Sequence, residues 1–103
     1  MAFEKLAPCS DIKTGKMERY SHDGVRILIC NVNDRYYAVS DTCTHEDFSL
    51  YLGALHDDVV KCSLHGGKFN VITGEPVEEP ACKALRTYPV EIRGADIYVE
   101  LGD

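Results

Sequence analysis

The chain has 103 residues, of which 45% are hydrophobic and 27% are charged, a composition typical of a single soluble globular domain. Its formal net charge of −6 argues against a nucleic-acid partner, which would require clustered Lys and Arg. No apolar run reaches the length of a membrane span and the first ten residues contain no signal sequence, so we expect a cytoplasmic protein.

Strand signals dominate the chain, and no long amphipathic helix is apparent. Residues 10–17 are expected to form a loop, because Gly15 interrupts the short helical turn that Ser10 could cap. The apolar segments Val25–Val32 and Arg35–Ser40 flank Asn33-Asp34, which is typical of a β-hairpin.

Three later segments extend the β pattern. Residues 58–62 are predicted to form a short strand that ends at Cys62, and residues 88–92 and 96–101 to form a second hairpin. The sequence therefore predicts an all-β domain.

Two loops beyond strands each contain one cysteine and one histidine. Cys43 is followed by His45 and Cys62 by His65, and 16 residues (46–61) separate the two pairs. Loops held by a rigid sheet commonly present ligands, because their backbone can turn toward a metal. The chain has five cysteines, an odd number, so metal ligation or burial explains the thiols better than a disulfide framework.

The four candidate ligands allow more than one kind of site. Two thiolates and two imidazoles satisfy tetrahedral zinc, so a zinc-binding interaction module is one interpretation. The usual zinc pattern, however, takes two cysteines from one segment and two histidines from the other. In a two-iron cluster one iron can bind both cysteines and the other iron both histidines. Each loop then provides one ligand to each iron, which agrees with the presence of one cysteine and one histidine in each loop. A nucleophilic cysteine is a third interpretation, although no residue is evident that would orient a Cys-His pair.

The segments CTH, CSLHGGKF, TGEP and PACKALRTYPV resemble the small Rieske ferredoxins of bacterial aromatic ring-hydroxylating dioxygenases, such as those for biphenyl, toluene and naphthalene. The resemblance covers nearly the whole chain. It implies one domain with the Rieske fold, in which antiparallel sheets carry two cluster-binding loops at one tip. It also implies one 2Fe-2S cluster, with Cys43 and Cys62 on the inner iron and His45 and His65 on the outer iron near the surface.

The resemblance further implies an electron carrier rather than an enzyme. Such a monomer passes single electrons from a flavin-dependent, NADH-oxidising reductase to a terminal oxygenase. Two other assignments within this family stay open, the small Rieske subunit of a nitrite reductase and a domain detached from an oxygenase.

Residues beside the ligands refine the expectation. Gly66 and Gly67 should let the backbone pass close to the cluster and turn N–H groups toward sulfur. By sequence alone Thr73-Gly74, Pro76 and Pro80 are turn residues in the segment 72–81, and the resemblance implies that this segment covers the cluster. High-potential family members have a disulfide between the ligand loops where Phe48 and Leu64 stand here, and hydroxyl donors to sulfur where Gly67 and Phe69 stand here. Because hydrogen bonds to sulfur stabilise the reduced state, we predict a reduction potential of about −150 mV.

The other histidines, the other cysteines and the acidic residues near the ligand pairs are not predicted to bind the cluster. His56 and His22 are predicted to be solvated turn residues and Cys30 a small buried hydrophobe, whereas Cys9 and Cys82 receive no role. Seven acidic residues near the ligand pairs could steer basic patches of protein partners toward the histidine edge; they are Glu46, Asp47, Asp57, Asp58, Glu75, Glu78 and Glu79.

Overall fold

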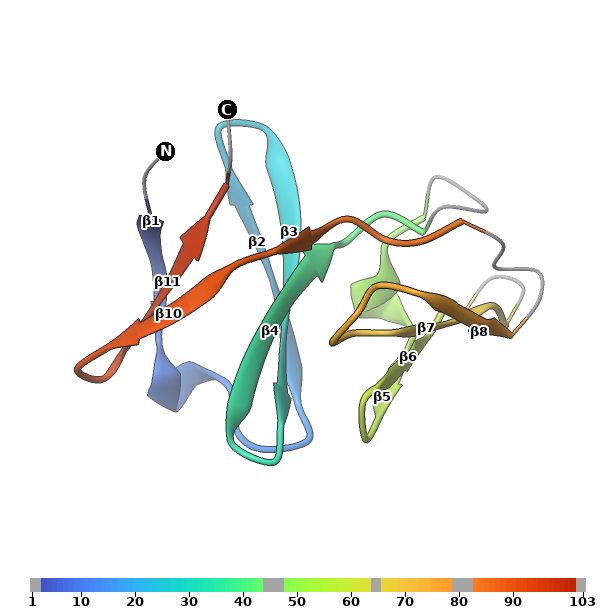
Figure 1. Cartoon of the computed structure of the whole chain (residues 1–103), viewed down its shortest axis with the longest axis horizontal. Coiled ribbons are helices and arrows are strands. Elements are labelled where there is room, and N and C mark those ends of the chain that lie inside the picture. Colours follow the sequence, from blue (N-terminus) through green and yellow to red (C-terminus); the bar gives the residue numbers. More distant parts are fainter. Residues whose placement is uncertain (1–2, 44–47, 64–65, 79–82, 102–103) are drawn as a thin grey trace.

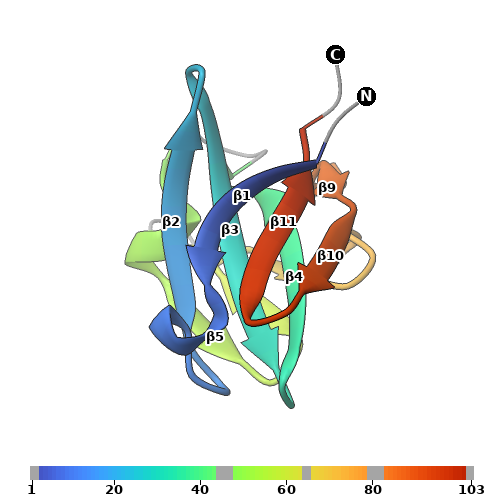
Figure 2. The same cartoon turned by 90° about the vertical axis from the view of Figure 1, so that its left-hand side faces the viewer.

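The computed structural model describes residues 3–43, 48–63, 66–78 and 83–101. In these residues the strands form three antiparallel sheets that follow one another along the longest axis of the molecule (Figure 1). The first sheet has the order β1-β11-β10 and consists of β1 (Phe3–Pro8), β11 (Asp96–Glu100) and β10 (Val90–Arg93). It lies in front of the other strands in Figure 2.

The second and third sheets each have four strands. The second, in the order β2-β3-β4-β9, consists of β2 (Met17–His22), β3 (Val25–Val32), β4 (Arg35–Ser40) and β9 (Thr87–Tyr88). The third, in the order β5-β6-β7-β8, consists of β5 (Ala54–His56), β6 (Val59–Lys61), β7 (Lys68–Asn70) and β8 (Pro76–Glu78). Two short 3₁₀ helices, η1 (Cys9–Asp11) and η2 (Leu50–Leu52), complete the described elements, and none of these helices could cross a membrane.

The predicted hairpin of β3 and β4 is confirmed, with the bounds expected from the sequence. Asn33 and Asp34 both have positive φ, 52° and 66°, as a tight turn of this kind requires. The side chain of Asn31 is buried and accepts the Asp34 N–H at 2.8 Å, while its amide donates to the carbonyl of Ile12 at 2.9 Å. This one residue therefore ties the turn to the loop that precedes β2.

Strand β3 joins two hydrophobic cores, because successive side chains of a strand point to opposite faces. Leu28, Cys30 and Val32 contribute to the core between the second and third sheets. Ile27 and Ile29 contribute to the core between the second and first sheets. With both of its faces covered, β3 forms the centre of the molecule.

The predicted strand at residues 88–92 is two strands in different sheets. Pro89 has no N–H to offer a ladder and separates β9 from β10. β9 pairs with β4, whereas β10 pairs with β11 in the predicted C-terminal hairpin. The segment thus crosses from the second sheet to the first.

Two predicted loops also contain regular structure. Residues 9–11 form η1, which has no side-chain cap, before the predicted loop continues toward β2. Pro76, predicted as a turn residue, is the first residue of β8 and pairs with Phe69. A proline is tolerated there because β8 is an edge strand.

Candidate metal centre

Cys43 lies at the base of the loop that follows β4. Its backbone N–H donates to the carbonyl of Phe48 at 2.9 Å, and Thr42 pairs with Ser49 in an antiparallel bridge. The cysteine is 3% exposed. The loop is therefore closed at the cysteine itself, and water has little access to the thiol.

Cys62 occupies the corresponding place after β6, as the sequence predicted. Its N–H donates to the carbonyl of Gly67 at 2.8 Å, its carbonyl accepts the N–H of Gly66 at 3.0 Å, and it is 2% exposed. In both loops the cysteine N–H bonds to a carbonyl five residues later, 43 to 48 and 62 to 67. Both cysteines also belong to the same hydrophobic core, so the two loops begin from one buried region.

His45 and His65 lie outside the described residues, as does Leu64. In the part of the chain that the structure describes, no three His, Cys, Asp or Glu side chains are arranged to hold a metal ion. The described half of the predicted set nevertheless fits an iron–sulfur group. It provides two buried sulfur donors at the bases of equivalent loops, and thiolate sulfur is the ligand that iron–sulfur clusters use.

The two glycines after the second loop have separable roles. Gly66 has φ of +78°, which a residue with a Cβ would adopt only with strain. Its N–H donates to the carbonyl of Cys62 at 3.0 Å, and the turning of backbone N–H groups toward the cluster sulfurs stays a prediction. Gly67 is buried and supplies the carbonyl that closes the loop.

The segment predicted to cover the cluster is anchored where it begins. Gly74 has φ of +81°, and its carbonyl accepts the N–H of Leu85 at 2.7 Å. A Cβ at this position would overlap the Leu85 carbonyl oxygen. The segment between these anchors includes residues 79–82, with Pro80 and Cys82, which lie outside the described residues.

Asp41 supports the first loop and was missed in the sequence. It is fully buried, and its carboxylate accepts the hydroxyl of Ser49 at 2.5 Å and the backbone N–H of Tyr51 at 3.0 Å. Its own carbonyl accepts the N–H of Leu50 at 2.6 Å. The available signal was an acidic residue directly after an apolar strand and two residues before Cys43.

Gly53 was also missed, and it connects the first loop region to the second. It follows η2, and its N–H donates to the carbonyl of Leu50 at 2.9 Å. A Cβ added to Gly53 would overlap the carbonyl oxygen of Lys61 and lie 3.2 Å from the backbone nitrogen of Ser63. The backbones on either side of Cys62 thus require a glycine here.

Two phenylalanines contribute to the packing around the two cysteines. Phe69 is fully buried in the core that contains both cysteines, and Phe48 packs against the same core. Phe48 cannot form the disulfide of the high-potential proteins. Cys9, Cys30 and Cys43 are free thiols in the described part of the chain.

Cys30 is buried as predicted. Desolvation, with a smaller contribution from the negative charge of Asp41, raises the pKa of its thiol to about 12. A thiol in this state is a poor nucleophile, because only the thiolate attacks. This argues against Cys30 as a catalytic residue.

His56 is solvated, as predicted, although it is the last residue of β5 rather than a turn residue. Its side chain is 94% exposed and lies 3.8 Å from the carboxylate of Asp57. Asp57 occupies the turn itself with φ of +55°.

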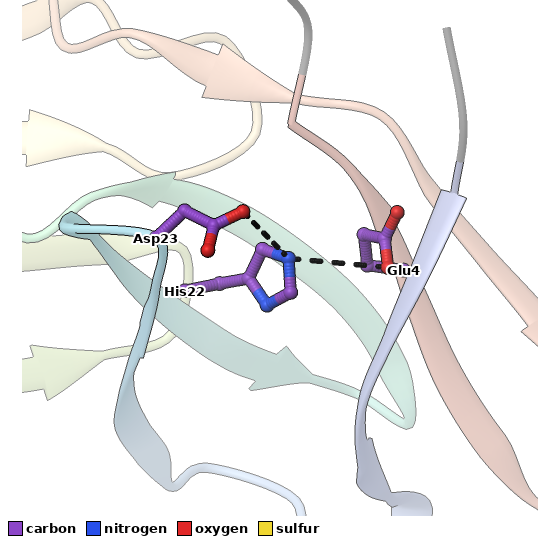
Figure 3. Close-up of polar contacts among 3 residues, drawn as sticks. All are labelled: Glu4, His22 and Asp23. Carbon is purple, nitrogen blue, oxygen red and sulfur yellow. Dashed lines mark ion pairs between the residues drawn. The ribbon is translucent and has the colours of Figure 1, made fainter.

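His22 differs more from its prediction. It ends β2, and its Nε2 lies 3.5 Å from the carboxylate of Asp23 and 3.9 Å from that of Glu4 on β1 (Figure 3). The imidazole is therefore placed between the first two sheets rather than being only a solvated turn residue.

Only some of the seven acidic residues near the ligand pairs are among the residues that the structure describes. Asp57 and Glu75 are exposed, whereas Asp58 accepts the side-chain amide of Asn70 at 3.3 Å and so has a structural contact. The structure describes the backbone of Glu78 but not its side chain. Glu46, Asp47 and Glu79 lie outside the described residues.

Comparisons with known proteins give one consistent result. The family model for the Rieske [2Fe-2S] domain matches residues 3–89. The ferredoxin component of biphenyl 2,3-dioxygenase from Rhodococcus jostii (strain RHA1) is 44% identical over 101 residues, which cover 98% of this chain and 94% of that protein.

Solved structures agree with the sequence comparison. A chain in the complex of reduced oxygenase and oxidized ferredoxin in carbazole 1,9a-dioxygenase has a TM-score of 0.91 at 38% identity, covering 94% of this chain and 91% of its own length. The Sphingomonas yanoikuyae B1 ferredoxin has a TM-score of 0.93 and covers 98% and 100%, which at 22% identity shows the fold alone. The expected all-β Rieske fold is confirmed.

Proposed function

The chain belongs to the Rieske 2Fe-2S domain family, and from this premise we propose that it carries single electrons to the terminal oxygenase of an aromatic-ring dioxygenase system. It is an electron-transfer component with one Rieske 2Fe-2S cluster and not itself an enzyme. The observation that carries this function is the similarity to ferredoxin components over almost the full length of both chains.

The ligand set is the finer part of the proposal. Cys43 and Cys62 would hold one iron of the cluster, and His45 and His65 would hold the other. The equivalent closure of the two loops at their cysteines, above one shared core, supports this assignment. When bound, the cluster supplies reversible one-electron chemistry, and two neutral imidazoles in place of two thiolates raise its potential above that of a four-cysteine cluster.

The chain's own residues contribute position and exclusion of water. The backbones of both buried cysteines are held by hydrogen bonds, which restricts the positions that the two sulfur donors can take. The hydrophobic core to which both cysteines belong keeps water from the two sulfur donors. Electron transfer at the histidine side would need neither a substrate pocket nor a general base.

The partners on either side of the carrier are proposed in the same terms. A flavin-dependent NADH-oxidising reductase supplies the electrons, and the oxygenase receives them. The net charge of −6 suits basic docking patches on both partners, and the contacts are small because a carrier must dissociate quickly. The carrier acts as a monomeric single domain in the cytoplasm, where NADH is available.

Metal analysis tests the proposal directly. Purified protein should contain two irons and two acid-labile sulfides per chain, and the dithionite-reduced protein should give a Rieske-type EPR signal. Zinc without acid-labile sulfide would contradict the electron-carrier function and would instead indicate a zinc-binding interaction module. Iron without the Rieske signal would contradict the mixed ligand set.

Ligand substitution tests the residue assignment. His45→Cys should move the EPR spectrum toward that of a four-cysteine cluster, because a thiolate replaces one imidazole. His56→Ala is the matched control, since this exposed histidine lies between the two pairs in sequence and should leave the spectrum unchanged. Loss of the cluster in His56→Ala would show that the ligands are misassigned.

A further inference from the structure

Asp41 is a buried charged residue whose role the electron-carrier function does not yet explain. Its side chain is fully buried two residues before Cys43, in the region from which the first ligand loop begins. Buried carboxylates are costly unless their oxygens are satisfied by donors. Here Oδ2 accepts the hydroxyl of Ser49 and Oδ1 accepts the N–H of Tyr51.

The hydrogen-bond chain fixes the direction of each proton. Arg19 on β2 donates from Nη1 to Oγ of Ser49 at 3.0 Å, and a guanidinium has no acceptor. Ser49 therefore accepts from Arg19 and directs its own proton to Asp41. Asp41 receives two donated hydrogens, which is the arrangement that a negatively charged carboxylate requires.

The positive charge of this hydrogen-bond chain lies at its solvent-exposed end. Arg19 is exposed, and its guanidinium stacks 5.0 Å from the centroid of the Tyr51 ring. It contacts Ser49 rather than Asp41, so the two charges are separated by a hydroxyl. The negative charge is inside the protein, and the compensating charge is at the surface.

The field of Asp41 extends into the core that contains the candidate ligands. After desolvation, the Asp41 charge is the second cause of the raised thiol pKa of Cys30. Cys30, Cys43 and Cys62 are members of the same core. A charge that opposes thiolate formation at one of these positions also opposes the addition of an electron nearby.

We propose that Asp41, held by Ser49 and Arg19, is a positioning residue for the first ligand loop whose fixed negative charge lowers the reduction potential of the cluster. The inference rests on the proposed function. Reduction adds one electron, and hence one negative charge, to the cluster. A neighbouring buried carboxylate disfavours that added charge, because repulsion is weakly screened in a low-dielectric interior.

The test is the reduction potential of Asp41→Asn, measured by EPR-monitored redox titration with dithionite as the reductant. Asparagine keeps the shape of aspartate and can still accept the Tyr51 N–H, while Ser49 can accept from the new amide. We expect the ratio of reduced to oxidised protein at a fixed solution potential to rise about tenfold, a positive shift of ~59 mV for one electron.

Asp34→Asn is the matched control. It removes the same charge from the turn that precedes β4, whereas Asp41 follows the end of that strand, and asparagine tolerates the positive φ of residue 34. The control should keep the wild-type potential. If Asp41→Asn retains its cluster and its potential equals that of Asp34→Asn, the proposed effect of the charge is wrong.

A second substitution keeps the test decisive if Asp41→Asn does not assemble. Arg19→Gln removes the exposed compensating charge and can still donate to Ser49, so the potential should fall, whereas Arg35→Gln at the start of β4 should not change it. An unchanged potential in Arg19→Gln would overturn the proposal. Absence of iron and sulfide from folded wild-type protein would instead contradict the proposed function, which separates the two failures.

Discussion

Phe69 brings an apolar ring, which has no hydrogen-bond donor, into the core that contains Cys43 and Cys62. The ring is fully buried, and β7 places it directly after the second loop. Gly67 likewise offers no side-chain donor. Single residues at this scale tune the cluster without altering the fold, because they change only the donors and charges around sulfur.

Phe69→Tyr should raise the reduction potential. A hydroxyl donating to sulfur stabilises the reduced form, and a net gain of roughly 1.4 kcal/mol corresponds to ~59 mV for one electron. Redox titration followed by visible absorption would measure the change. Phe3→Tyr adds the same hydroxyl on β1 and should have no effect; an unchanged potential in a fully loaded Phe69→Tyr protein would contradict the prediction.

Cys30 should make the protein less stable at alkaline pH. The unfolded thiol ionises near its ordinary pKa of 9.0, whereas the folded thiol keeps its proton to about pH 12. Stability from this group is therefore complete below pH 9 and is lost as the pH rises toward 12. At pH 11 the loss is about 3 kcal/mol.

Urea unfolding of wild type and Cys30→Ala at pH 8 and pH 11 measures this loss. The alanine variant is less stable at pH 8, because a buried side chain is shortened. The difference between the two proteins should shrink at pH 11. Cys9→Ala serves as the control. If the difference in unfolding free energy between wild type and Cys30→Ala is equal at both pH values, ionisation of Cys30 does not cause the loss of stability at alkaline pH.

At the scale of elements, the two ligand loops depend on a short connection between them. η2 follows the first loop, and Gly53 then passes against the backbone on both sides of Cys62. The hairpin of β5 and β6 returns the chain to that cysteine. The close backbone approach at Gly53 thus helps to set the spacing of the two loops.

Gly53→Ala should destabilise the protein by about 2–3 kcal/mol and reduce its cluster content. The added methyl group must displace the Lys61 carbonyl and with it the base of the second loop. Thermal unfolding and the iron content of the purified variant measure both effects. Ser63→Ala, at an exposed position next to the contact, should retain stability and cluster; wild-type behaviour in Gly53→Ala would show that the loop base can move freely.

Across the whole molecule, the three sheets share their cores. β3 contributes alternate residues to both cores, and the core beneath the ligand loops draws on the second and third sheets together. The Cα radius of gyration is 12.6 Å, close to the ~13 Å of a compact single domain of about 100 residues. Both hydrophobic cores of the described residues therefore include side chains of β3.

Unfolding should therefore occur as one cooperative transition. Far-UV circular dichroism, which reports the sheets, and visible absorption, which reports the cluster, should be lost at the same denaturant concentration. Loss of absorption at a clearly lower concentration would show that the third sheet opens independently.

The sequence by itself determined the kind of centre and the main strands. One cysteine and one histidine in each of two loops indicated a Rieske cluster, and the apolar segments on either side of Asn33-Asp34 set the central hairpin, because ligand chemistry and strand periodicity are local properties. The tertiary structure decided which segments meet. Pro89 divides one predicted strand between two sheets, and Arg19, Asp41 and Ser49 form one hydrogen-bond chain from separate parts of the sequence. These relations depend on how the sheets pack around β3, which no local pattern specifies.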